Sequence, residues 1–331
     1  MRDLFKKIRF IYLIPLLYLT FTGCEPLVSE YDEVDDCDLY VSANNPEGEA
    51  KDTILVMTWN IRFGIARALW YIDCCGDRSV FTKEEVQNGL SNIVKKINEL
   101  KPDILFIQEI DINCKRSGYI DEMQYIIDNT YFKYAAYASR LHDQYLPSDN
   151  LGRINTGNAV FSRWKLTAER IQLPDRTDYD ALSSYFYMRS SFVKAKIQMP
   201  EHKSFYAIAT HFEAFATDST RKMQAEKLAS ELAKIDAISA NWILGADFNM
   251  IPPGSDKVDF CMDDKCEGES YHNPGDKPFH KDGSNCEPDT SNLRILYTKY
   301  KPDITLDVYK QNQEKYFSYL PAHTQRNYVT D

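Results

Sequence analysis

The sequence predicts an α/β domain with two β-sheets, and three observations support this. A β–α–β unit at 53–109 places an amphipathic helix between two apolar strands. Later runs alternate apolar and polar residues and are joined by short polar turns, which is typical of antiparallel pairs. Several apolar runs also end abruptly in a polar residue, the usual place for sites in α/β sheets. Since β–α–β units are mixed with antiparallel pairs, we expect one domain with two sheets.

The β–α–β unit is the clearest element. Thr53–Arg62 is β-branched and apolar, so we expect a strand there. Thr82 and Glu85 have the spacing of a helix capping box, and apolar residues then recur at helical spacing until Pro102 ends the helix. Asp103–Glu109 is a nearly continuous apolar strand that ends in a carboxylate.

The rest of the chain alternates strands with fewer helices. Periodicity predicts helices at Met123–Ile127, from Asp218 onward and at Leu293–Tyr300. It predicts strands at Tyr131–Ala138, Thr156–Ser162, Leu166–Leu173, Ser190–Met199, Ser204–His211 and Ile304–Tyr309. A further strand begins at Trp242 and opens into a loop by Met250. The segment at about 252–292 is polar and rich in Gly, Pro, Asp and Cys, and we interpret it as an insertion.

The N-terminus has the features of an export signal. Basic residues precede the apolar run Phe10–Phe21, and Gly23-Cys24 follows, as in a bacterial lipobox with Phe21 at the usual leucine position. We expect residues 1–23 to be a lipoprotein signal peptide, with Cys24 lipidated and the protein anchored to the bacterial outer membrane or cell surface. A plain secretory signal is the alternative. Residues 24–52 are predicted to be an acidic flexible tether, and 53–331 the domain.

Charge limits the partners. The net charge is −10, and without residues 1–23, which carry four basic residues and one acidic one, it becomes −13. This field disfavours nonspecific binding to duplex nucleic acid, whereas small phosphorylated molecules and lipid headgroups are less affected.

Seven cysteines remain besides Cys24, and no CxxC pair occurs, which disfavours a zinc site. Because seven is odd, at least one thiol is expected to be free. The pairing of the others stays open: Cys37, Cys74, Cys75, Cys114, Cys261, Cys266 and Cys286.

Polar residues at four strand ends form the candidate site. Glu109 is a carboxylate suited to a hard cation such as Mg²⁺, and Asn60 could help to position that cation. Asp247 and Asn249 are two residues apart, so in extended backbone their side chains point the same way. His211 could donate to a phosphoryl oxygen. Each residue also has a plain structural interpretation: turn formation for Asn60, Glu109, Asp247 and Asn249, and a buried core position for His211.

At these residues the sequence resembles the endonuclease/exonuclease/phosphatase superfamily. The matching segments are VMTWNIRFG, PDILFIQEID, TGNAVFSR, IATHF and ILGADFN, in the family's order over Ile54–Met250. The resemblance implies a four-layer α/β sandwich with two facing mixed sheets. It also implies hydrolysis of phosphate mono- or diesters by in-line attack of water, with one or two Mg²⁺ or Mn²⁺ ions.

The same resemblance assigns roles. Asn60 and Glu109 would serve the metal, Asp247 and Asn249 would orient the nucleophile and the phosphate, and His211 would stabilise phosphoryl oxygens. Arg62 and Asn158 are candidate phosphate-binding residues. The substrate would be a phosphorylated small molecule, a lipid headgroup or a nucleic acid, and the protein is expected to be a monomer.

Three positions depart from the family pattern. Arg62 stands where some relatives have a second carboxylate, and Ala246 replaces a glycine. The family's closing Ser-Asp-His motif has no match, because no Asp-His dipeptide occurs in the chain. We therefore expect a domain that is incomplete at its C-terminus. Two hypotheses remain: an exported, lipid-anchored phosphoesterase, or an inactive surface lipoprotein that uses the fold as a binding module.

Overall fold

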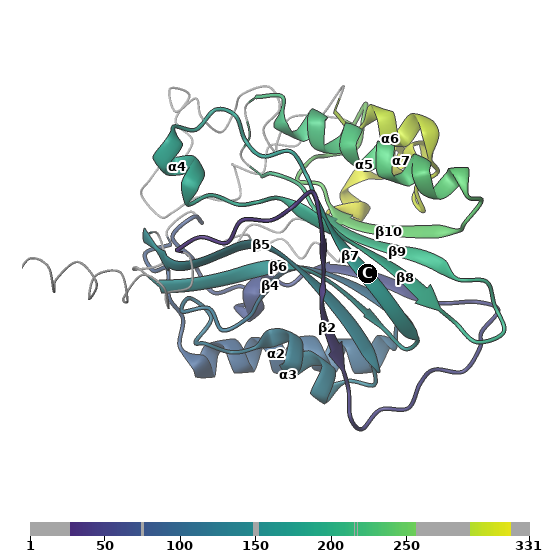
Figure 1. Ribbon diagram of the computed structural model, residues 1–331, viewed down its shortest axis with the longest axis horizontal. Helices are drawn as coiled ribbons and strands as arrows, with labels where there is room; N and C mark the ends of the chain where they lie inside the picture. The colour runs from purple at the N-terminus through teal and green to yellow at the C-terminus, as the bar shows by residue number, and fades with distance from the viewer. Residues whose placement is uncertain are drawn as a thin grey trace, which may run out of the picture.

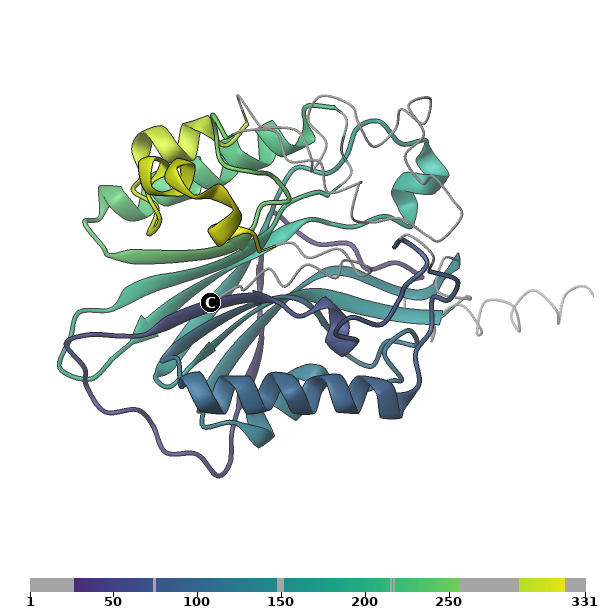
Figure 2. The ribbon, with the colours of Figure 1, turned by 180° about the vertical axis from the view of Figure 1, so that it is seen from behind.

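Two five-stranded β-sheets pack face to face, with helices on both outer faces (Figures 1 and 2). This arrangement is seen in a computed structural model of the chain that describes residues 27–73, 76–147, 152–214, 216, 218–255 and 292–318. The four layers confirm the predicted α/β sandwich.

The first sheet contains both strands of the predicted β–α–β unit. Its strands, in spatial order, are β2 (Asp38–Val41), β5 (Tyr134–Leu146), β6 (Gly152–Ser162), β4 (Ile104–Asp111) and β3 (Val56–Asn60). β3 and β4 are parallel, as a β–α–β connection requires, and the other pairs are antiparallel.

The second sheet has the same mixed character. Its strands, in spatial order, are β1 (Val34–Asp36), β7 (Lys165–Gln172), β8 (Ser191–Gln198), β9 (Phe205–His211) and β10 (Trp242–Asp247). β9 and β10 are parallel, and the other pairs are antiparallel. The short turn predicted after Ser162 joins strands of opposite sheets, and Trp164 is fully buried where the chain crosses between them.

Helices cover the two outer faces, and apolar residues fill the layer between the sheets. α2 (Lys83–Leu100) and α3 (Glu122–Asn129) pack on the first sheet. α5 (Thr220–Ala237) and α6 (Arg294–Lys299) pack on the second. The remaining helical segments are η1 (Arg62–Gly64), α4 (Ala181–Tyr185), α7 (Leu306–Gln311) and η4 (Gln313–Tyr316). None of the helices in the described part of the chain combines the length and apolar character that a membrane span requires.

Local sequence determines where α2 begins. The backbone N–H of Glu85 donates to Thr82 Oγ1 (3.2 Å), and the N–H of Thr82 donates to Glu85 Oε2 (2.9 Å). The predicted capping box is therefore present. Lys101, in the left-handed region with φ 53°, ends the helix just before Pro102.

Two predicted elements are wrong. The tether expected over 24–52 contains β1 and β2, which add one edge strand to each sheet, and the chain crosses between the sheets at buried Cys37. Most side chains of both strands are exposed, so no apolar alternation marks them. The strand expected at Ile304–Tyr309 is instead α7, because Thr305 caps a helix by accepting from the Val308 N–H.

Cysteine chemistry is defined for two of the eight residues. Cys37 and Cys114 are buried free thiols, and burial raises the pKa of both. The predictions for the other cysteines fall outside the described residues: Cys24, Cys74, Cys75, Cys261, Cys266 and Cys286. Residues 256–291, most of the predicted insertion, also lie outside them.

Close contact between the two sheets requires a glycine in β10. A Cβ atom placed on Gly245 would lie 2.3 Å from Cδ2 of Phe106, a buried residue of β4. We predict that Gly245→Ala lowers the free energy of unfolding by about 1–3 kcal/mol, because the extra methyl group overpacks the core. Urea unfolding of the single variant measures this loss.

The cause of this loss can be tested in a second background. Phe106→Leu shortens the side chain that the new Cβ would meet, so Gly245→Ala should cost less there than in the original protein. Equal costs in both backgrounds would show that Phe106 does not impose the glycine.

Candidate active site

The ends of four strands meet at one end of the sandwich. β3 and β4 run parallel in one sheet and β9 and β10 run parallel in the other, and β10 contacts both β3 and β4. Asn60, His211 and Asp247 are the last residues of their strands, and Glu109 lies two residues before the end of β4. The structure thus brings together the polar residues that the sequence singled out at strand ends.

Glu109 is turned toward this end by a bulge in β4. The register with β6 shifts between Gln108 and Ile110, and Glu109 has φ 54°, in the left-handed region that is uncommon for residues other than glycine. A bulge redirects the side chain of its extra residue. Side chains before and after Glu109 are buried in β4, whereas its own side chain is 28% exposed. Strain of this kind is concentrated at functional sites.

Asn60 joins the two sheets at the site. Its Nδ2 donates to Glu109 Oε1 and to Asp247 Oδ2, both at 3.0 Å. Its Oδ1 accepts from the Arg62 N–H (3.0 Å), which fixes the orientation of the amide. In this arrangement Asn60 holds the two carboxylates in place and directs its nitrogen, not its oxygen, toward them.

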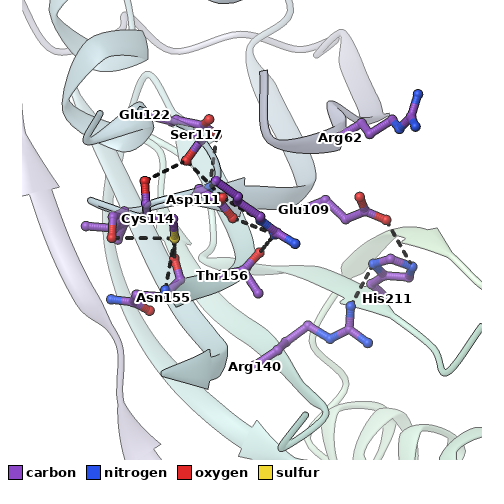
Figure 3. A network of polar contacts seen from close by, with 12 residues as sticks. Arg62, Glu109, Asp111, Cys114, Ser117, Glu122, Arg140, Asn155, Thr156 and His211 are labelled. Atoms are coloured by element: carbon purple, nitrogen blue, oxygen red, sulfur yellow. Dashed lines mark hydrogen bonds and ion pairs between the residues drawn. The ribbon is translucent and has the colours of Figure 1, made fainter. Parts of the chain in front are cut away.

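His211 lies against the same carboxylates and is almost completely buried. Its Nε2 is 3.9 Å from Glu109 Oε1 and 3.9 Å from Asp247 Oδ2, as Figure 3 shows for Glu109. Arg140 Nη1 donates to Nδ1 (2.7 Å), and the Asn249 amide nitrogen is 2.6 Å from Nε2. Burial, followed by the positive charge of Arg140, lowers the pKa of His211, which favours the neutral ring.

Asn249 continues the turn after β10. It has φ 51°, and its backbone N–H donates to Asp247 Oδ1 (2.9 Å). Its side chain donates to the Phe212 carbonyl (3.0 Å), and its own carbonyl accepts from Arg221 (3.1 Å). Asp247 and Asn249 do form a turn, as the plain interpretation suggested, but the turn also fixes both side chains beside His211.

The two predicted phosphate-binding residues have different surroundings. Arg62 forms an ion pair with Asp73, and in Figure 3 its side chain lies apart from that of Glu109. Asn158 is fully buried, lies opposite Gln108 in the β4–β6 register, and donates to the Ser191 carbonyl (3.0 Å). Its Oδ1 has no hydrogen-bond partner among the described residues.

Sequence reasoning missed a buried polar network beneath Glu109. Arg116 donates to both carboxylate oxygens of Asp111 (2.8 Å each), and Ser117 donates to the same group (2.9 Å; Figure 3). The Asp111 N–H donates to Glu122 Oε2 (2.9 Å), while burial raises the pKa of Glu122. Because Asp111 ends β4, this network anchors the strand that carries the Glu109 bulge. Asp111 lies in PDILFIQEID, but no sequence spacing marks Arg116 as its partner.

Arg140 is a second residue that sequence reasoning missed. It lies in β5 at another register shift, between Ser139 and Leu141, and its guanidinium reaches His211 (Figure 3). The run Tyr131–Ala138 was predicted to be a strand, and the structure extends this strand through Arg140 to Leu146. A bulge cannot be inferred from apolar alternation, so no sequence signal placed Arg140 at the site.

The donor chemistry fits a hard cation. Two carboxylates, Glu109 and Asp247, converge on one amide nitrogen, and oxygen ligands of this kind are those that Mg²⁺ prefers. The set is small: among the described residues, no group of three or more His, Cys, Asp or Glu side chains is arranged to hold a metal ion. Water and substrate oxygens normally complete the coordination shell of Mg²⁺.

Three solved structures that the chain resembles are distant in sequence. The chain is 16% identical to an endonuclease/exonuclease/phosphatase from Beutenbergia cavernae (TM-score 0.38), with 54% of this chain and 43% of that one covered. It is 20% identical to the human Nocturnin catalytic domain (TM-score 0.41; 65% and 69% covered). It is 13% identical to a mannosyl-6-phosphatase from Bacteroides thetaiotaomicron (TM-score 0.39; 60% and 67% covered).

Sequence comparison assigns the family. No curated protein matched the chain. The model of the Endonuclease/Exonuclease/phosphatase family matches residues 57–305, which is most of the chain and includes every residue of the site described above. The chain therefore belongs to the endonuclease/exonuclease/phosphatase family.

Proposed function

We propose that this protein is an exported, lipid-anchored, Mg²⁺-dependent phosphoesterase that hydrolyses phosphate mono- or diesters by in-line attack of water. The observation that carries the proposal is the convergence of Glu109 and Asp247, from opposite sheets, on the amide of Asn60 beside His211. Two carboxylates held together in this way repel each other, and a bound cation would relieve that repulsion.

The side chains of the site would have two roles: some hold the cation, and others orient the groups around it. Glu109 and Asp247 would hold the cation, with Mn²⁺ as an alternative to Mg²⁺, and the cation would supply neutralisation of charge on the phosphoryl oxygens. Asn60 holds both carboxylates in position by donating a hydrogen bond to each. Asn249 orients Asp247 through its backbone N–H and contacts His211 through its amide.

Neutral His211 is positioned more firmly than a surface histidine. Contacts with Arg140 and Asn249 engage both of its ring nitrogens. We infer that it orders the carboxylate pair and the substrate oxygens by hydrogen bonding, and that it does not act as a positive charge. The pKa lowered by burial is consistent with this role.

One observation favours the alternative of a noncatalytic binding module. The described residues supply two carboxylates and one histidine, but no group of three ligands suited to a metal. A protein that binds phosphate esters without turning them over would keep the same cluster. Turnover of phosphate esters distinguishes the enzyme from the binding module.

Removal of either carboxylate should abolish turnover. We predict that Glu109→Gln and Asp247→Asn each reduce Mg²⁺-dependent hydrolysis of p-nitrophenyl phosphate and bis(p-nitrophenyl) phosphate by at least about 100-fold, the scale of losing one preorganised electrostatic group. Glu226→Gln, at an exposed position on α5, is the matched control and should retain full activity. Absence of metal-dependent turnover in the unaltered protein would support the binding module.

Metal binding can be measured without activity. Mg²⁺ should raise the melting temperature of the protein, since a ligand that binds only the folded state stabilises it. Glu109→Gln should lose most of this shift and Glu226→Gln should keep it. An equal shift in both variants would mean that the cation binds elsewhere.

Membrane anchoring depends on Cys24, which lies outside the described residues. We predict that Cys24→Ser moves the protein from the membrane fraction to the soluble fraction, because lipid attachment requires the thiol. Cys286→Ser, which replaces a cysteine far along the sequence from the signal segment, should leave the protein in the membrane fraction. Equal fractionation of both variants would favour a plain secretory signal.

A further inference from the structure

Arg140 carries a buried charge that no carboxylate contacts directly within the described part of the chain, although Glu213, Glu109 and Asp247 attract it from beyond ion-pair distance. The residue is only 3% exposed, yet it forms no ion pair within the described part of the chain, and its Nε has no hydrogen-bond partner there. The one hydrogen bond of its side chain in that part is from Nη1 to Nδ1 of His211. A buried cation without a direct ion pair is costly, so the position of Arg140 needs an explanation.

Other buried arginines show how the chain normally treats this charge. Arg116 is paired with both oxygens of Asp111. Arg170 has Asp35 at 3.9 Å and donates to the carbonyls of Ser139 and Arg189. Unlike these two, Arg140 has no carboxylate within ion-pair distance and donates to no carbonyl among the described residues.

The backbone directs Arg140 to the active site in the same way as it directs Glu109. Both residues lie at register shifts, Glu109 in β4 and Arg140 in β5, and both of these strands pair with β6. In Figure 3 their side chains approach His211 from two sides. Two bulges in one sheet therefore place a carboxylate and a guanidinium on either side of one imidazole.

The charge pattern suggests what Arg140 binds. Glu109 and Asp247 form the negative part of the site, on the Nε2 side of His211, and Arg140 forms the positive part, on the Nδ1 side. A guanidinium is well suited to phosphoryl oxygens, because its N–H groups match their geometry. A phosphate ester has several such oxygens, so one phosphoryl group could face the carboxylate-bound cation and Arg140 together.

We propose that Arg140 is the phosphoryl-binding residue of this site, and that the substrate's phosphate compensates its charge. The proposal rests on the phosphoesterase function and assigns the anion-binding role to a residue that was not among the predicted ones. The two predicted phosphate-binding residues do not supply a free positive charge. Arg62 is paired with Asp73, and Asn158 is buried and uncharged. His211 then links the cation-binding and anion-binding parts of the site.

Binding of inorganic phosphate tests the proposal without requiring turnover. Isothermal titration calorimetry of the full chain in detergent, at saturating Mg²⁺, would compare four proteins: the unaltered chain, Arg140→Met, Arg140→Lys and Arg163→Met. Arg140→Met should weaken phosphate binding by at least about tenfold, the scale of one charge-assisted hydrogen bond. Arg140→Lys should be intermediate, because it keeps the charge and loses the planar fork.

Arg163→Met is the control, since Arg163 is a partly buried arginine that pairs with Asp103, at the end of β4 away from Glu109. It should bind phosphate as the unaltered chain does, even if its melting temperature falls. Retention of the Mg²⁺-induced thermal shift by Arg140→Met would show that the rest of the site is intact. If Arg140→Met fails to fold, Arg140→Lys carries the test.

Unchanged phosphate affinity in the folded Arg140 variants would overturn the proposal, as would absence of phosphate binding by the unaltered chain. Failure of the proposed function has a different signature: no ester hydrolysis by the unaltered chain, with phosphate binding that still depends on Arg140. The converse result, full hydrolysis and undiminished phosphate affinity in Arg140→Met, would remove the inference and leave the phosphoesterase function standing.

Discussion

The amide of Asn60 is the interaction on which the site depends. It donates to a carboxylate of its own sheet, Glu109, and to a carboxylate of the facing sheet, Asp247. Since its oxygen is held by the Arg62 N–H, the amide cannot turn without losing a hydrogen bond. The two sheets must therefore pack in one register for the carboxylates to converge. Gly245, with no side chain to separate β10 from Phe106, permits the approach.

Strained backbone at the site and a buried ion pair beneath it help to bring the polar side chains together. Glu109 and Asn249 both have positive φ values, and each uses that conformation to turn a side chain toward His211. Below them, the Asp111–Arg116 pair anchors the end of β4 with a bidentate hydrogen bond in the core. Such conformations persist only when the surrounding structure determines them. The sandwich supplies a rigid frame, and the functional groups occupy its irregular positions.

Much of the fold could be predicted from the sequence, because most elements bury one periodic face. The strand alternation at Ser190–Met199 and the capping box at Thr82 both correspond to observed elements. The edge strands at 34–41 were missed because backbone pairing holds them while most of their side chains stay exposed. At Ile304–Tyr309 the apolar residues suggested a strand, but the cap formed by Thr305 decided for a helix.

The residues of the candidate site also fall into two groups, those that the sequence pattern reveals and those that only the tertiary structure reveals. Glu109, His211, Asp247 and Asn249 could be proposed because strand ends are visible in the sequence. Arg140 and Arg116 could not, since one depends on a bulge and the other on a tertiary ion pair.

The central claim is that Glu109 and Asp247 hold one cation between them. Mn²⁺ titration followed by electron paramagnetic resonance, on Glu109→Gln, Asp247→Asn and the double variant, tests it most directly. We expect each single substitution to remove nearly all tight binding, so that the double variant is little worse than either one. Independent, additive losses, or tight binding in the double variant, would contradict a shared site.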